Sequence, residues 1–298
     1  MEGKTNKTGI KFRNFKVFWN GLDIPVKTSS RNNYEAMSFK NEIAYCRIVR
    51  KFIKNKYKFY VQLVFKGVPI LKAPRYKYAT DGDVGLDIGT QTIAISSDKD
   101  VKIYELADRV IGIEKIKLNL SRKLDRSRRK NNPGNYNDDG TIRKQGNKKV
   151  FWNISNRYIK QRNKLKNIHR KISDIRKYQH ECLANEIIMQ GNKIYVETMN
   201  FKALQKRSRV TKKNDNTGRI SRKKRFGKSI GNKAPAMLLS IIDRKLKYRG
   251  SNLIKIDTWS VKASQYNHLD GSCTKKKLSQ RWNDLSGIRC REICTLHF

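Results

Sequence analysis

Cysteine is scarce in this chain and is not arranged in pairs. The 298 residues include five cysteines, which form no CxxC pair and no even framework. This usage excludes a disulfide scaffold and indicates a reducing compartment. Cys290, Cys294 and His297 are spaced like half of a zinc site, but they offer three ligands without a fourth, so no zinc site is assigned.

Long apolar segments are missing as well. No apolar run approaches the ~18 residues that a membrane-spanning helix needs, and no signal peptide opens the chain. A basic protein of the membrane surface is therefore the weaker hypothesis. We expect no membrane partner.

Acidic residues are few compared with basic ones. The chain has 68 Lys and Arg residues against 25 Asp and Glu residues, a net charge of +43. Enzymes of small metabolites do not need such a charge, which repels itself unless a polyanion is bound. Nucleic acid is therefore the expected partner. Because 37% of the residues are hydrophobic, a real core is possible, and we expect a folded, cytoplasmic, nucleoid-associated protein.

The first 80 residues favour β-strands. Residues 15–19 and 43–52 are strand-like, and residues 57–65 alternate apolar and polar side chains. We expect residues 1–80 to form a partial, β-rich module of the β-barrel type. Its abrupt start, without a helix, predicts that an N-terminal portion is missing.

The remainder, residues 81–298, alternates strands and helices. Three short strands in meander order are predicted over residues 84–88, 92–96 and 101–106. The apolar spacing then becomes helical over about residues 109–190, and Arg and Lys fill the other helix faces. We expect this helical insertion to contact phosphates.

A second basic segment spans residues 201–233. It holds 13 Lys and Arg residues and one acid, Asp215, so we expect it to be mobile until it meets a nucleic-acid backbone. The two basic segments together supply the predicted nucleic-acid-binding residues. These are Arg122, Lys123, Arg126, Arg128, Arg129, Lys130, Arg157, Lys160, Arg162, Lys164, Arg170, Lys206, Arg207, Arg222, Lys223, Lys224 and Arg225.

The last predicted elements are a helix over residues 236–249, ended by Gly250, and a strand over residues 253–258. The predicted order is thus three strands, helices, a strand, a helix and a strand. Such an order is typical of an α/β fold with an RNase H-like mixed sheet and inserted basic helices.

Two acids stand at the ends of apolar, strand-like segments. Asp87 lies in the run from Val84 to Thr90, and Glu197 ends the run that starts at Lys193. As neighbouring strands of one sheet, these segments would bring both carboxylates to the same edge. Hard cations such as Mg²⁺ take oxygen ligands, and two ions roughly 4 Å apart can catalyse phosphodiester hydrolysis. Asp87 and Glu197 are therefore the predicted catalytic and metal-binding residues.

A second hypothesis starts from the motif around Asp87. Actin, chaperone ATPases and sugar kinases carry a similar Gly-x-Asp-x-Gly-Thr motif that cradles nucleotide phosphate, which would make this chain an ATP-dependent phosphotransferase. Those proteins need further glycine-rich phosphate loops and are usually acidic to neutral. This chain has no such loops and carries a charge of +43, so the nuclease hypothesis is favoured.

Three motifs, in order, resemble a known family. Residues 84–96, residues 193–204 (KIYVETMNFKAL) and residues 256–265 (IDTWSVKASQ) are similar to the RuvC-type core of the TnpB/OrfB proteins of insertion sequences, which are related to type V CRISPR effectors. The resemblance covers about residues 40–290. It implies an RNA-guided, Mg²⁺-dependent DNA endonuclease with an N-terminal wedge domain of the β-barrel type, encoded by a bacterial-type mobile element. The implied partners are DNA and a guide RNA from the transposon end.

The chain departs from the family pattern at both ends. The family's N-terminal helical segment and recognition region are not evident, and the zinc knuckle is reduced to the lone Cys273. The third RuvC acid, expected after Trp282, is absent. One alternative frame of codons for residues 290–297 can encode Val-Gln-Arg-Asp-Leu-Tyr-Ser-Ala-Phe, so we hypothesise that a frameshift near Arg289 replaced the catalytic helix.

Loss of one of three carboxylates predicts a weak or incomplete Mg²⁺ site and impaired or absent DNA cleavage. Asp257, Asp284 and Glu292 are no better supported as substitutes for the missing acid. The alternative hypothesis is a non-catalytic protein that still holds RNA or DNA through its basic helices.

Overall fold

The computed structural model describes residues 4–28, 33–67, 81–143, 146, 149–206, 212–213, 216, 220–221, 226–257, 282–285 and 288–291. The chain forms two compact units. One comprises residues 1–75 and 112–172, and the other comprises residues 76–111 and 173–298. The helical insertion is therefore shared between the units, whereas the sequence placed all of it in a domain from residue 81 to 298.

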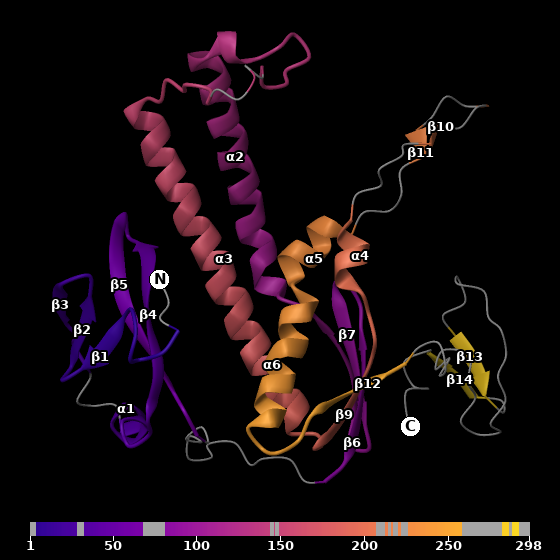
Figure 1. The fold of residues 1–298 in the computed structure, drawn as a ribbon. Helices are drawn as coiled ribbons and strands as arrows, with labels where there is room; N and C mark the ends of the chain where they lie inside the picture. Colours follow the sequence, from indigo (N-terminus) through magenta and orange to yellow (C-terminus); the bar gives the residue numbers. More distant parts are fainter. Residues whose placement is uncertain are drawn as a thin grey trace. The chain divides into compact units, whose positions relative to one another are not determined.

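The second unit is built around a five-stranded mixed sheet in the order β12-β9-β6-β7-β8 (Figure 1). Strands β6 (Asp83–Ile88), β7 (Thr92–Ser97) and β8 (Val101–Glu105) form an antiparallel meander. Strands β9 (Lys193–Glu197) and β12 (Leu253–Ile256) extend the sheet from β6 in parallel. The mixed sheet and the order of its elements along the chain were predicted from the sequence, whereas the order of the strands within the sheet was not.

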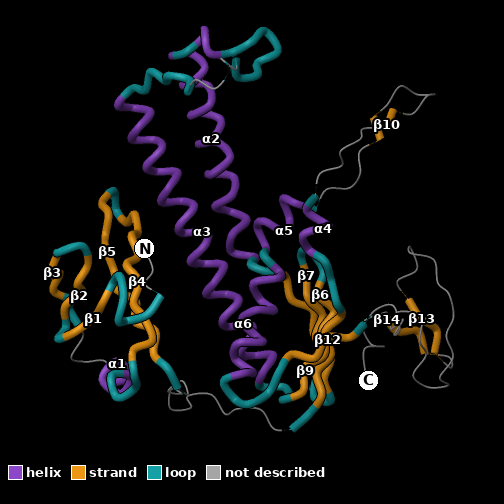
Figure 2. The backbone as a smooth tube through the Cα atoms, in the orientation of Figure 1, coloured by secondary structure: helices purple, strands orange, loops and turns teal. Residues whose placement is uncertain are grey.

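One face of this sheet carries the core of the unit. Val84, Leu86 and Ile88 alternate along β6, and all three are buried. They belong to one apolar cluster with the C-terminal part of α3 (Asn156–Ile188) and with α6 (Pro235–Lys247). Figure 2 shows these helices beside the sheet. Alternation at a period of two therefore leaves the other face for Asp83, Gly85 and Asp87.

Helix α6 shows why the sequence forms these elements. Pro235 stands at its first turn, and the buried Leu238, Ile242 and Leu246 repeat every fourth residue on its sheet-facing side. At the other end Gly250 has a φ of 76°, and the amide of Ser251 donates to the carbonyl of Leu246 at 3.1 Å. The predicted glycine termination is confirmed, because only a residue without a Cβ adopts this conformation readily.

A close backbone approach fixes where β6 and β9 begin. The amides of Asn192 and Lys193 donate to the carbonyl oxygen of Gly82 at 3.1 and 3.2 Å. A Cβ at Gly191 would overlap that carbonyl and lie 2.8 Å from Cγ2 of Val84. A glycine is therefore required at the entry to β9.

The first unit contains two separate antiparallel sheets. Its elements are β1 (Lys11–Arg13), β2 (Lys16–Trp19), β3 (Leu22–Pro25), α1 (Asn33–Ser38), β4 (Ile43–Ile53) and β5 (Lys56–Phe65). Phe12, Val17 and Cys46 are buried between the meander β1-β2-β3 and the hairpin β4-β5. No closed barrel forms in the part of the chain that the structure describes. The predicted β-rich module is therefore present as two sheets that share one core, without closure among these residues.

Two long helices agree with the predicted helical insertion. They are α2 (Ile111–Asn131) and α3. The buried Asn132 fixes the connection between them, since its amide group donates to the carbonyls of Arg128 (2.9 Å) and Asn153 (3.0 Å) and accepts from the amide of Asn153 (2.6 Å). Neither helix, nor any other described helix, is long and apolar enough to cross a membrane.

The segment expected to be mobile has a short helix at each of its ends. Helices α4 (Phe201–Gln205) and α5 (Gly227–Lys233) bury Phe201 and Ile230 in the sheet's core cluster. The mobility of residues 201–233 stays a prediction, and the burial of Phe201 and Ile230 shows that the ends of the segment contribute to the core. The remaining strands are short: β10 (Lys212–Lys213) with β11 (Ile220–Ser221), and β13 (Trp282–Leu285) with β14 (Ile288–Arg291).

Candidate functional site

Asp87 and Glu197 lie on neighbouring parallel strands at the same end of the sheet. The register pairs Gly85 with Tyr195 and Leu86 with Val196, so the next position places Asp87 beside Glu197. Asp87 is exposed and Glu197 is partly exposed, while the residues before them, Leu86 and Val196, are buried. The structure thus brings together the two acids that the sequence singled out.

Strand β12 flanks Glu197 on its other side. Ile256 pairs with Glu197, and the carbonyl of Ile256 accepts from both the amide (3.1 Å) and the hydroxyl (3.0 Å) of Thr198. Asp257 follows directly at the carboxyl end of β12. Since neighbours in a strand point to opposite faces, continuation of β12 would direct Asp257 away from the face of Glu197.

The described part of the chain does not gather a third metal ligand beside Asp87 and Glu197. No group of three or more His, Cys, Asp or Glu residues that could hold a metal is present there. Asp284 lies in β13, and Glu292 is outside the described residues, as are Cys294 and His297 of the apparent half zinc site. Among the described residues, Asp87 and Glu197 therefore form an acidic pair.

Helix α5 is tied to the turn that follows Asp87. The hydroxyl of Ser229 donates to the carbonyl of Thr90 at 3.0 Å. At the other end of α5, Nη1 of Arg176 donates to the carbonyl of Gly231 at 2.6 Å, and Nε2 of His180 donates to the carbonyl of Lys233 at 2.7 Å. These bonds satisfy carbonyl groups that a helix leaves open at its C-terminus.

The same network holds two buried ionisable side chains. His180 is fully buried, and its burial lowers the pKa of the imidazole. Lys233 is also buried, and its ammonium lies 2.7 Å from a carboxylate oxygen of Glu105. Sequence reasoning missed this network. Its one signal is the spacing of four residues between Arg176 and His180, which places them on one side of α3.

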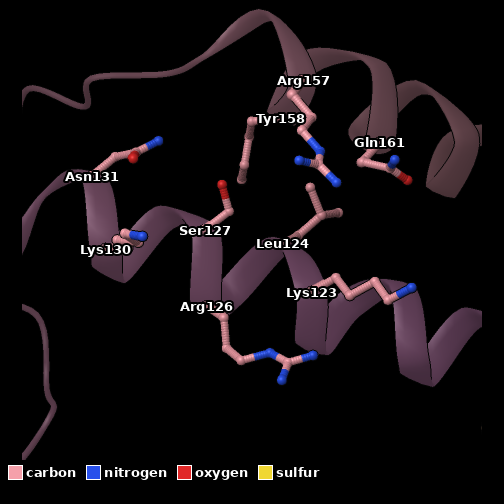
Figure 3. A pocket seen from close by; sticks show the side chains of 9 residues that line it. All are labelled: Lys123, Leu124, Arg126, Ser127, Lys130, Asn131, Arg157, Tyr158 and Gln161. Carbon is pink, nitrogen blue, oxygen red and sulfur yellow. The ribbon is translucent and has the colours of Figure 1, made fainter.

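The basic helices form a hollow in the first unit. It has a volume of about 450 Å³ and lies between the C-terminal half of α2 and the start of α3. Figure 3 shows Arg157 and Tyr158 of α3 facing Leu124 and Ser127 of α2. Its other lining residues are Lys123, Arg126, Lys130, Asn131 and Gln161. Four cations around an aromatic ring and an apolar floor offer both charge and contact area to a polyanion.

The predicted basic residues fall into four groups, of which Arg128 and Arg129 form the last. The exposed cations on α2 and α3 are Arg122, Lys123, Arg126, Lys130, Arg157, Lys160, Arg162 and Lys164, and Lys206 is exposed after α4. Arg170 is partly buried on α3. Arg207, Arg222, Lys223, Lys224 and Arg225 lie outside the described residues.

Arg128 and Arg129 have partners within the protein. Both pair with Asp125, at 3.2 and 3.0 Å, and their guanidinium groups lie over Trp152 (5.0 Å) and Tyr136 (4.9 Å), respectively. Arg129 also donates to the carbonyl of Gly140 at 3.2 Å. These contacts give the two arginines a structural role at the end of α2, and a role in binding nucleic acid stays a prediction.

Comparisons with known proteins give a limited result. No protein-family model matches the chain, and no curated protein does. Among solved structures, it is similar to a chain of a Cas12f1–sgRNA–target DNA complex at 14% identity and a TM-score of 0.44. A chain of a CRISPR-Cas12f ternary complex follows at 16% identity and a TM-score of 0.30.

Each match covers 83% of this chain and 42% of the other, so this chain spans less than half the length of either solved chain. At these identities and TM-scores the likeness carries no functional conclusion. The features that bear on function are the sheet, the acidic pair and the basic helices.

Proposed function

We propose that this chain is an RNA- and DNA-binding protein with an RNase H-like sheet, of the TnpB/OrfB type that its motifs resemble. Asp87 and Glu197 are two ligands of an incomplete Mg²⁺ site, and DNA cleavage is impaired or absent. The polyanions are DNA and a guide RNA from a transposon end.

One observation carries the proposal. The parallel register of β6 and β9 brings Asp87 and Glu197 side by side, although 110 positions separate them in the sequence. A parallel pair of strands requires a long crossover connection, and here this connection contains the basic helices α2 and α3. The topology therefore joins an acidic edge and a polycationic insertion in one chain, which suits an enzyme fold that acts on nucleic acid.

The acidic pair fits one hard cation better than two. Two carboxylates on adjacent strands supply oxygen ligands of the kind that Mg²⁺ prefers, and bound Mg²⁺ would polarise a phosphodiester. The described residues contain no group of three or more His, Cys, Asp or Glu side chains that could hold a metal. Holding two ions in line takes more ligands than Asp87 and Glu197 provide. Their role in this chain is to bind and orient one cation weakly.

The basic helices supply the binding energy for the polyanion. Exposed cations such as Lys123, Arg126 and Arg157 surround the hollow between α2 and α3. Each phosphate contact by such a side chain releases counterions, so binding should weaken steeply with salt. The sequence of these helices carries no motif for reading base edges, which agrees with recognition of backbone and shape.

Binding can be tested by fluorescence anisotropy with labelled RNA and duplex DNA over a series of salt concentrations. We expect log Kd to rise linearly with log salt, with a slope of about 0.9 per phosphate contacted on duplex DNA. The double variant Arg126→Ser/Arg157→Ser should lower this slope by about 1.8, which corresponds to the loss of two phosphate contacts. A chain that binds neither polyanion at low salt would contradict the proposal.

The acidic pair can be tested with Mn²⁺ or Mg²⁺ titrations and a plasmid cleavage assay. Weak cation binding should be lost in Asp87→Ala and Glu197→Ala but kept in Asp83→Ala. Asp83 is a matched control because it is exposed and belongs to the same strand, at its opposite end. Equal binding by Asp87→Ala and wild type would refute the site. Strong cleavage that Asp87→Ala abolishes would keep the site and refute the impaired activity.

An ATP-dependent phosphotransferase is the second candidate, and the turn after Asp87 argues against it. A phosphate cradle needs backbone amides that can point at the ligand. Here the amide of Gly89 donates to the carbonyl of Thr92 at 2.9 Å. Saturable ATP binding that displaces no nucleic acid would favour this candidate over the nuclease-like one.

A further inference from the structure

The outer half of the β4-β5 hairpin exposes aromatic rings that its core does not use. The inner half packs in the first unit, where Cys46 is buried and Ile48, Val61 and Leu63 lie against the same cluster. Beyond this point Phe59 is 67% exposed and Tyr57 is 48% exposed. Exposed aromatic groups of this size in a strand mark an interaction surface when they gather on one face.

Register shows that these rings do gather. Phe59 pairs with Arg50 and Tyr57 pairs with Phe52, and the two pairs are two residues apart along both strands. Residues at a separation of two share a face of a sheet. Arg50, Phe52, Tyr57 and Phe59 therefore form one patch, which we call the hairpin patch.

Cations accompany the rings of the hairpin patch. The guanidinium carbon of Arg50 lies 4.5 Å from the ring centre of Tyr57. The ammonium of Lys166 lies 5.2 Å from the ring of Phe52 and 3.5 Å from the hydroxyl of Tyr57. These contacts hold the rings of Phe52 and Tyr57 in place, and they leave Phe59 as the most exposed ring.

Charge identifies the kind of partner. Residues 43–65 contain no Asp or Glu and six basic residues: Arg47, Arg50, Lys51, Lys54, Lys56 and Lys58. Rings interleaved with cations match a single-stranded nucleic acid, whose bases stack on aromatic groups while its phosphates meet the cations. Paired bases hide their faces within the helix, so the rings would gain little from a duplex. An apolar protein partner would bury these charges without compensation.

We propose that the hairpin patch binds unpaired nucleotides, with Phe59 as the stacking ring and with Arg50 and Lys166, whose cationic groups lie over the neighbouring rings, placed for the adjacent phosphates. The proposal deepens the proposed function and rests on it, because it assumes a nucleic-acid partner. It adds a preference for single strands, which the basic helices α2 and α3 do not provide.

The test compares the full-length chain with its Phe59→Ala variant in anisotropy titrations on a single-stranded RNA, a single-stranded DNA and a duplex. Phe59→Ala should weaken single-strand binding by about 5- to 150-fold and leave duplex binding unchanged. Phe59→Trp should restore it. Phe151→Ala is the matched control, because Phe151 is 85% exposed in the same unit and its loss should change neither affinity.

A 2-aminopurine placed in the single strand reports stacking directly. Its fluorescence should change on binding to wild type and Phe59→Trp, and much less on binding to Phe59→Ala. If wild type binds nucleic acid while Phe59→Ala keeps full single-strand affinity, the hairpin patch is refuted and the proposed function stands. If wild type binds no nucleic acid, both fall. If Phe59→Ala loses affinity for single-stranded RNA but keeps its affinity for single-stranded DNA, the proposal that unpaired bases of both kinds stack on Phe59 is also overturned.

Discussion

Removal of Glu105 should destabilise the sheet unit more than removal of its partner Lys233. The ammonium of Lys233 lies 2.7 Å from Glu105, and the two side chains are 8% and 47% exposed. Taking one partner from a buried ion pair costs about 3–5 kcal/mol because an uncompensated charge remains. Glu105 is half in water, which screens the pair, so we expect about 1–3 kcal/mol for Glu105→Gln.

Lys233→Met should behave differently. Methionine keeps most of the buried aliphatic chain and removes the charge, and such replacements of buried ionic groups are often neutral or stabilising. Glu105 would then lose a partner but remain in contact with water. We expect a change smaller than about 1 kcal/mol, and the double variant should be about as stable as Lys233→Met alone.

The assay is urea unfolding followed by circular dichroism, with all variants in one buffer. Asp243→Asn is the control, because Asp243 pairs with Lys247 at 2.8 Å on α6, in the same unit, where the partner Lys247 is 59% exposed, and the change in net charge is identical. It should cost about 0.5 kcal/mol or less. If Lys233→Met costs more than Glu105→Gln, or if Glu105→Gln behaves like Asp243→Asn, the inference of a buried, charge-dependent contact is wrong.

Two further predictions concern buried polar groups. Burial lowers the pKa of His180, so the unfolded chain binds the proton more tightly, and the free energy of unfolding should fall as the pH drops below about 6.5. His180→Gln should show less of this fall than wild type in unfolding measured against pH, whereas the exposed His169→Gln should follow wild type. Asn132→Ala, which removes three hydrogen bonds, should cost about 1–3 kcal/mol and speed amide hydrogen exchange in the connection between α2 and α3. Unchanged exchange there would show that Asn132 does not fix the connection.

The sheet could be predicted because its signals are local. Alternating apolar residues mark β6, a short apolar run marks β7, the spacing of four marks α6, and Gly250 marks the end of that helix. The pairing of Asp87 with Glu197 needed one more step, namely that two strands joined by a long crossover lie parallel in the same sheet. Both the strand signals and the long crossover can be read from the sequence.

The hairpin patch escaped prediction for a different reason. Residues 57–65 alternate as a half-buried strand should, so the pattern gives the strand but not the depth of its burial along its length. Only the packing of the meander β1-β2-β3 decides that Val61 and Leu63 contact the core while Phe59 does not. Burial of the outer half depends on tertiary contacts, and these are not encoded in the alternation.

The network around α5 shows the same limit for charged residues. The strongly basic composition of residues 201–233 gives no sign that one of these residues is buried. Lys233 is nevertheless buried, because Glu105 pairs with it and because α5 ends against α3. A helix of seven residues cannot satisfy its own terminal carbonyls, so Arg176 and His180 supply donors from the neighbouring helix. Since Ser229 of the same helix bonds to Thr90, these donors also hold the turn that follows Asp87. The end of β6 that carries Asp87 is therefore held by residues outside the motifs around Asp87 and Glu197. This is why the motifs locate the two acids but not the residues that position them.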